Sequence, residues 1–246
     1  MYEYNVGIIA EGPTDVEVIE GILRTVFAKD TFCFRTISPT PQELQSQRKK
    51  EGFGWGGVYR VCKDLREKLE MLTLMGAAFD LLVIHVDGDV AYKDYADIEE
   101  QPLQNDLPCA SVTAEVQEAG SSLEDVVCQW LNHSTDISIP VVLCLPFLST
   151  ETWAGQLLYP GEWTDIDEKT SEDIIYHRLF LLGQPKSEKE RRLIRQKAGK
   201  MKKNTKGYQN LARQMTAAGW MGVTQRYVQA KRFDAALKEE TRRIRQ

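Results

Sequence analysis

Residues 81–89, with the sequence LLVIHVDGD, join a short apolar run to an acidic turn. The run is too short for an ordinary helix and rich in branched side chains, so it predicts a buried β-strand that ends at Asp87-Gly88-Asp89. Residues 4–13, YNVGIIAEGP, repeat the pattern, because another apolar run stops at Glu11 and a glycine. The sequence therefore predicts two buried strands, each followed directly by carboxylates.

Helical patterns separate the predicted strands. A helix is expected after the first strand, where Thr14 stands three residues before Glu17 in capping-box spacing, and another is expected after Ser121. Further apolar strands are predicted over residues 32–37 and 139–147. Strands that are apolar on both faces and separated by helices indicate a Rossmann-like α/β fold, with a mostly parallel sheet between helices.

The chain is expected to divide into an α/β core over residues 1–160 and a basic, mainly helical region over residues 161–246. Residues 183–210 look like a polar, basic connector within the second region, and residues 52–57 look like a flexible glycine loop. That loop carries Phe53 and Trp55, so it is a surface for stacking bases, an ordinary flexible loop or an interface with a partner.

Composition restricts the class of protein. The 246 residues are 42% hydrophobic and 27% charged, which is typical of a globular chain and argues against disorder throughout. No apolar run approaches the roughly 20 residues that cross a bilayer, so a cytoplasmic protein without a membrane partner is expected. The cysteines are odd in number and form no close pair, which favours reduced core thiols: Cys33, Cys62, Cys109, Cys128 and Cys144.

Charge is distributed unevenly along the chain. Residues 186–246 contain 18 Lys or Arg against five Asp or Glu, although the whole chain has a net charge of −5. A concentrated basic region is the usual footprint of a polyanion partner, which makes nucleic acid the expected partner. The alternative is a solvated basic helical face that binds nothing.

The predicted strand ends gather acidic residues. In parallel sheets the ligand site lies beyond the carboxyl ends of the strands, where Glu11, Asp87 and Asp89 are expected. Neighbouring carboxylates repel one another, and a hard divalent cation such as Mg²⁺, or Mn²⁺, relieves that repulsion. Asp15 is either a fourth ligand or a favourable partner of a helix dipole. Asp-Gly-Asp is also a common turn sequence.

Together, Glu11-Gly12-Pro13-Thr14-Asp15 and Asp87-Gly88-Asp89 resemble the TOPRIM domain in order and spacing. The resemblance covers roughly residues 4–151. Asp15 makes the first motif more similar to small TOPRIM nucleases, including the overcoming-lysogenization-defect type, than to topoisomerases or primases. The resemblance implies that Glu11 serves as ligand or general acid/base, that Asp87 and Asp89 bind Mg²⁺, and that Asp15 assists a second ion.

Three further residues are candidates near this site. Glu151 follows the last predicted strand and is either a metal ligand, as similarity to stand-alone TOPRIM proteins with an acid-x-Trp element implies, or an acid at the start of a helix beside Thr150. Lys206 is the preferred catalytic lysine of the basic segment, because Lys-Gly-Tyr permits a turn there and a lysine beside Mg²⁺ would stabilise charge on phosphate. His85 is expected to be an ordinary core histidine.

The sequence thus predicts a metal-dependent endonuclease that hydrolyses phosphodiesters with two ions, with DNA favoured over RNA. By resemblance, it would be the effector of an anti-phage defence system with a separate ATPase partner. One alternative is a TOPRIM-like interaction subunit with little catalysis of its own. Another is phosphotransfer or glycosyl transfer, since Asp-x-Asp strand ends also bind Mg²⁺-nucleotides.

Overall fold

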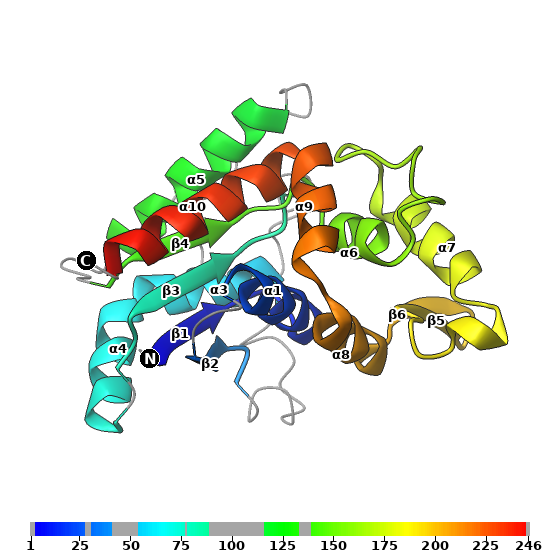
Figure 1. The fold of residues 1–246 in the computed structure, drawn as a ribbon. Coiled ribbons are helices and arrows are strands. Elements are labelled where there is room, and N and C mark those ends of the chain that lie inside the picture. Colours follow the sequence, from blue (N-terminus) through cyan, green and yellow to red (C-terminus); the bar gives the residue numbers. More distant parts are fainter. Residues whose placement is uncertain are drawn as a thin grey trace.

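The computed structural model describes residues 3–27, 31–40, 54–76, 78–88, 116–132 and 139–244. Four parallel strands form a sheet in the order β2-β1-β3-β4 (Figure 1). They are β1 (Glu3–Ile9), β2 (Thr31–Ser38), β3 (Leu81–His85) and β4 (Val141–Cys144). The predicted α/β fold with a parallel sheet is confirmed.

Helices cover both faces of this sheet, as Figure 1 shows. α3, α4 and α5 share one buried apolar cluster with the sheet, and α1, α6, α7, α8, α9 and α10 share the other. The bounds of the first group are α3 (Gly54–Lys63), α4 (Leu65–Leu74) and α5 (Val116–Asn132). Those of the second are α1 (Pro13–Val26), α6 (Glu151–Leu158), α7 (Glu172–Leu182), α8 (Thr205–Gln214), α9 (Ala217–Arg226) and α10 (Val228–Ile244).

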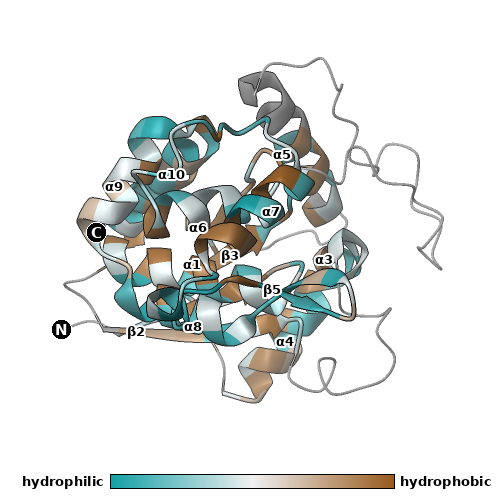
Figure 2. Ribbon diagram, turned by 90° about the vertical axis from the view of Figure 1, so that its right-hand side faces the viewer, coloured by the Kyte–Doolittle hydropathy of each residue, from teal (hydrophilic) through white to brown (hydrophobic). Residues whose placement is uncertain are grey.

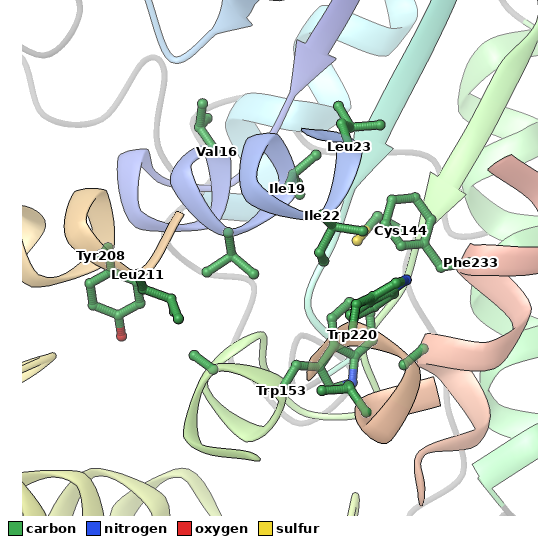
Figure 3. Close-up of a cluster of buried hydrophobic side chains, with 14 of the residues drawn as sticks. Val16, Ile19, Ile22, Leu23, Cys144, Trp153, Tyr208, Leu211, Trp220 and Phe233 are labelled. Atoms are coloured by element: carbon green, nitrogen blue, oxygen red, sulfur yellow. The ribbon is translucent and has the colours of Figure 1, made fainter. Parts of the chain in front are cut away.

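The larger cluster joins the beginning and the end of the chain. Ile19 and Ile22 of α1 pack in the same cluster as Trp153 of α6, Trp220 of α9 and Phe233 of α10 (Figure 3). The rings of the last three are close, with centroids 5.8 Å apart for the two tryptophans. The C-terminal region is mainly helical, as predicted, but its helices complete the core of the α/β region across the boundary expected at residue 160.

A short antiparallel hairpin stands outside the main sheet, where the sequence suggested only a connector. It consists of β5 (Ile194–Lys197) and β6 (Lys200–Lys203), joined through Ala198 and Gly199. Both connecting residues have positive φ, at 51° and 76°, as a type I′ hairpin turn requires. In Figure 1 the hairpin lies on the side to which the carboxyl ends of the sheet strands point.

Three local expectations are wrong. α1 begins at Pro13 with Gly12 as its N-cap, so Thr14 is not the cap but a buried residue of the first turn. α5 begins at Val116, five residues before the expected cap. The glycine segment enters α3, and its Trp55 is buried against Trp130 with ring centroids 6.2 Å apart, which removes it from base stacking.

The cysteines match the expectation only in part. Cys62 and Cys144 are buried and Cys33 and Cys128 are exposed, and none of these four forms a disulfide; Cys109 lies outside the described residues. No helix in the part of the chain that the structure describes is long and apolar enough to span a bilayer.

Candidate metal centre

The ends of β1 and β3 lie side by side and bring their acidic residues together. Ile9 of β1 is paired with Ile84 of β3, and the chain continues from these residues to Glu11 and Asp87. Glu11 Oε1 accepts a hydrogen bond from the backbone N–H of Asp87 at 2.8 Å. Both residues are buried, at 9% and 8% exposure. The two strand ends are thus tied together by the carboxylate that the first motif supplies.

Gly88 allows the second motif to turn against the neighbouring loop. Its N–H donates to the carbonyl oxygen of Pro146 at 3.0 Å, and a Cβ at this position would lie 1.9 Å from the carbonyl oxygen of Phe147. A side chain therefore cannot be placed there without moving the backbone. This close approach explains why glycine follows Asp87.

Asp15 comes from the first turn of α1 and points into the same region. Its side chain is buried, and Oδ1 accepts a hydrogen bond of 2.7 Å from the hydroxyl of Thr150, the residue before α6. Lys203 Nζ, from the end of β6, lies 3.8 Å from the same oxygen. Asp15 is therefore held by the two elements that flank the strand ends.

His85 is the last residue of β3 and lies beneath the carboxylates. Its side chain has no exposure, and Nε2 lies 3.1 Å from Oδ1 of Asp87. The other ring nitrogen, Nδ1, is buried and has no hydrogen-bond partner among the described residues. The imidazole is therefore not only a packed core side chain, because Nε2 contacts Asp87 and Nδ1 has no hydrogen-bond partner among the described residues.

Asp15, His85 and Asp87 form a buried group that could hold a metal ion. One donor atom from each residue lies within 4.8 Å of the other two. The group offers two carboxylates and an imidazole, which are the side chains that bind divalent metals in proteins. Glu11 borders this group through its hydrogen bond to Asp87.

The buried charges influence one another strongly. Burial raises the pKa of Asp87 to about 6, although His85 opposes this rise. Burial disfavours the charged form of His85, but the charge of Asp87 and the hydrogen bond to it raise the pKa of His85 to about 9. Burial also opposes ionisation of Asp15, but Lys203 and His85 outweigh it and hold the pKa of Asp15 below its ordinary value.

A second set of polar contacts lies beside the group. Lys203 Nζ is 2.9 Å from Oε1 of Glu151, and the hydroxyl of Tyr208 donates to the same oxygen at 2.7 Å. Glu151 is fully buried, and its Oε2 has no hydrogen-bond partner in the described part of the chain. Lys203 therefore links Glu151 to Asp15 and compensates the charge of both.

The structure brings together some of the predicted site residues. Glu11, Asp15 and Asp87 converge, and Glu151 joins them through Lys203. Asp89 lies outside the described residues. Lys206 has an exposed side chain on α8, and its catalytic role stays a prediction.

Two residues of the site were not chosen from the sequence. Lys203 belongs to a run of lysines in which only strand alternation distinguishes it, because in KMKK the second and fourth residues share a face. His85 sits in an apolar strand next to an acidic turn, and that adjacency was its only signal.

Comparison with protein-family models, curated proteins and solved structures finds no match to this chain. The TOPRIM resemblance therefore rests on the two motifs and on their meeting at adjacent strand ends.

Proposed function

We propose that the chain is a divalent-metal-dependent nuclease that hydrolyses phosphodiester bonds at the Asp15–His85–Asp87 group. The observation that carries this proposal is the approach of three buried donor atoms to within 4.8 Å of one another, at the carboxyl ends of two parallel strands. Such strand ends are where ligand sites of parallel sheets lie.

The donor set favours a metal that accepts both oxygen and nitrogen. Carboxylates suit Mg²⁺ and Mn²⁺, whereas an imidazole ligand suits the transition metals better. Asp15 and Asp87 would supply oxygens, and His85 would either supply a nitrogen or orient Asp87. Mn²⁺ satisfies this mixed set more readily than Mg²⁺, and a second ion remains part of the proposal.

Glu11 and Lys203 are assigned separate roles in the proposed hydrolysis. A bound divalent cation would supply an acidified water and polarise a phosphate oxygen. Glu11, at the edge of the group and on the other strand, is the candidate to accept the proton of an attacking water. Lys203 would offset the negative charge of Asp15 and Glu151, so that a phosphate can approach three or more carboxylates.

Nucleic acid is the proposed substrate, for two reasons. The motifs around Glu11 and Asp87 resemble those of TOPRIM nucleases, and residues 186–246 carry a large excess of positive charge. Polyanions are attracted by such a region. DNA over RNA, an anti-phage role and an ATPase partner come from the resemblance alone and stay proposals.

One observation favours a second candidate, a TOPRIM-like interaction subunit without catalysis. Lys203 and Thr150 already satisfy Asp15, and Tyr208 and Lys203 satisfy one oxygen of Glu151, all within the chain. A carboxylate cluster that is neutralised in this way can be structural. The two candidates differ in whether metal supports cleavage.

Cleavage of supercoiled plasmid in Mg²⁺ and in Mn²⁺ separates them. We expect the wild-type protein to nick or linearise DNA, and Asp87→Asn and Glu11→Gln each to lose about two or more orders of magnitude in rate. Asp125→Asn, which changes an exposed carboxylate on α5, is the matched control and should cut normally. Absence of cleavage by the wild type in either metal, or normal rates in both site variants, would favour the interaction subunit.

A further inference from the structure

The β5–β6 hairpin separates its side chains into two different faces. Strand alternation and the register place Ile194, Gln196, Met201 and Lys203 on one face, of which Gln196 is exposed. Ile194 and Met201 pack against the larger apolar cluster, and Lys203 reaches Glu151 and Asp15. This inward face therefore fastens the hairpin to the core and to the candidate metal centre.

The outward face consists only of cations. Arg195 pairs directly with Lys202, and Lys197 pairs directly with Lys200, so both cross-strand pairs on this face are like-charged. All four side chains are exposed, and none makes an ion pair with another described residue. Like charges placed opposite one another destabilise a strand pair, so folding alone does not account for this arrangement.

The hairpin lies at the carboxyl ends of the sheet strands. Figure 2 views the molecule from the side to which the carboxyl ends of the sheet strands point, and β5 lies toward the viewer in hydrophilic colour. Lys202, on the outward face, is adjacent in sequence to Lys203, which is 3.8 Å from Asp15. The hairpin that carries the cationic face therefore borders the metal group through Lys203, and the four cations point to the opposite side of the same two strands.

We infer that the outward face of the β5–β6 hairpin, Arg195, Lys197, Lys200 and Lys202, binds the phosphate backbone of a nucleic acid, on the same hairpin whose inward Lys203 contacts the metal centre. The naming of nucleic acid as the polyanion rests on the proposed function. The regularly spaced phosphates of a nucleic-acid strand would neutralise both like-charged pairs at once. Binding would therefore offset the repulsion that the pairs cause in the free protein. The contacts are to backbone, so they carry no sequence specificity.

The test is fluorescence anisotropy of a labelled 24-base-pair DNA duplex with the full-length protein in EDTA, at several salt concentrations. Glutamine replaces all four cations of the hairpin in one variant. The control variant loses the same charge at four exposed positions elsewhere, through Lys186→Gln, Lys189→Gln, Lys231→Gln and Arg242→Gln.

We expect the hairpin variant to bind roughly 100-fold more weakly near 0.1 M salt, with the slope of log affinity against log salt smaller by about 3 to 4. The control should change affinity by less than about three-fold. The melting temperature of the hairpin variant should be unchanged or higher, because the like-charged pairs are gone. Lost binding then cannot be attributed to unfolding.

Three results would overturn the inference. They are equal weakening in both variants, no duplex binding by the wild type, and wild-type binding to vesicles with 30% phosphatidylserine that exceeds its binding to DNA. EDTA removes the divalent metal that the proposed cleavage needs, so binding is measured separately from cleavage. Normal binding by the hairpin variant, with cleavage abolished in Asp87→Asn, would reject the inference alone. If the hairpin variant loses DNA binding but the wild type cleaves DNA in no metal, the nuclease proposal alone would be rejected.

Discussion

Lys203 is the cation on which two carboxylates of the site depend. It lies 2.9 Å from Glu151 and 3.8 Å from Asp15, and its side chain is 27% exposed. Burial works against the charged lysine, but Asp15 and Glu151 raise its pKa well above the ordinary value. Removing one partner of such a cluster leaves carboxylates without compensation in a poorly hydrated place.

Replacing Lys203 with methionine should therefore destabilise the protein. We expect a loss of about 2 kcal/mol in the free energy of unfolding at pH 7, less than for a fully buried pair because Lys203 is partly solvated. Lys202→Met removes the same charge from the exposed face of the same strand and should change stability little. Urea unfolding measures both variants, and equal losses would contradict the role given to Lys203.

The same variant should show a defined pH dependence. The pKa of Asp15 in the folded protein is below its ordinary value, so its ionised form contributes stability above the unfolded pKa of about 3.9, and that contribution is lost as pH falls through the folded pKa. Without Lys203, burial should raise this pKa instead. The stability gap between wild type and Lys203→Met should narrow from pH 7 to pH 4. If the difference in unfolding free energy stays constant or grows as the pH falls, the ion pairs of Lys203 with Asp15 and Glu151 are not its cause.

At the scale of single residues, the sequence predicts a site residue when local context fixes its position. Glu11 and Asp87 end apolar strands, and parallel strands that are neighbours must bring such ends together. The sequence alone could not show that Lys203, and not Lys202 or Lys206, is the lysine at the site, because this depends on the register of the hairpin. His85 could not be distinguished from a packed core residue without the distance to Asp87.

α1 and α8 approach so closely that a glycine is needed between them. A Cβ on Gly21 would lie 2.9 Å from Cα of Ala212 and 2.7 Å from Cε of Met215. This packing matters for the site, because α1 carries Asp15 and α8 carries Tyr208. The position of both residues relative to Glu151 depends on it.

Gly21→Ala should push these helices apart. We expect a loss of about 1–3 kcal/mol in the free energy of unfolding, because the clash is with helix backbone that cannot rotate away. Gly222→Ala in α9 is the matched control, since nothing lies within 4 Å of its Cβ position. It should be neutral or stabilising by up to about 1 kcal/mol, from helix propensity. Thermal unfolding that ranks the two variants in the opposite order would contradict this packing.

Elements with strong apolar patterns were predictable, and short amphipathic ones were not. The strands β1, β2, β3 and β4 follow from apolar runs, although their ends differ by a few residues. The β5–β6 hairpin was missed because each strand has four residues and its inward face carries few apolar side chains. The beginning of α3 was missed because glycines at residues 52–57 hide the helical spacing that places Trp55 in the core.

At the scale of the whole molecule, one apolar cluster extends from β1 to α10. Tyr208, Leu211, Trp220 and Phe233 are buried with α1 and α6 in this cluster (Figure 3). Sequence reasoning could not foresee this, because the basic composition of residues 186–246 conceals apolar positions that recur on only one side of each helix. The basic surface and the completed core belong to the same helices.

A fragment that ends at Gly183 should therefore fail to fold. It lacks α8, α9 and α10, whose removal exposes one side of α1 and α6. We expect the fragment to lack a near-ultraviolet circular dichroism signal and a cooperative thermal transition, in contrast to the full chain. A soluble fragment with both signals would show instead that the region before Gly183 is an independent domain.

Calorimetric titration of Mn²⁺ into the metal-free, full-length protein measures whether Asp15, His85 and Asp87 hold a divalent metal. We expect saturable binding by the wild type, at least ten-fold weaker binding by folded Asp87→Asn and Asp15→Asn, and unchanged binding by Asp125→Asn. Asn preserves the size of each side chain but removes its charge. Equal Mn²⁺ affinity in all four proteins, or no Mn²⁺ binding by the wild type, would show that Asp15, His85 and Asp87 do not form a metal site.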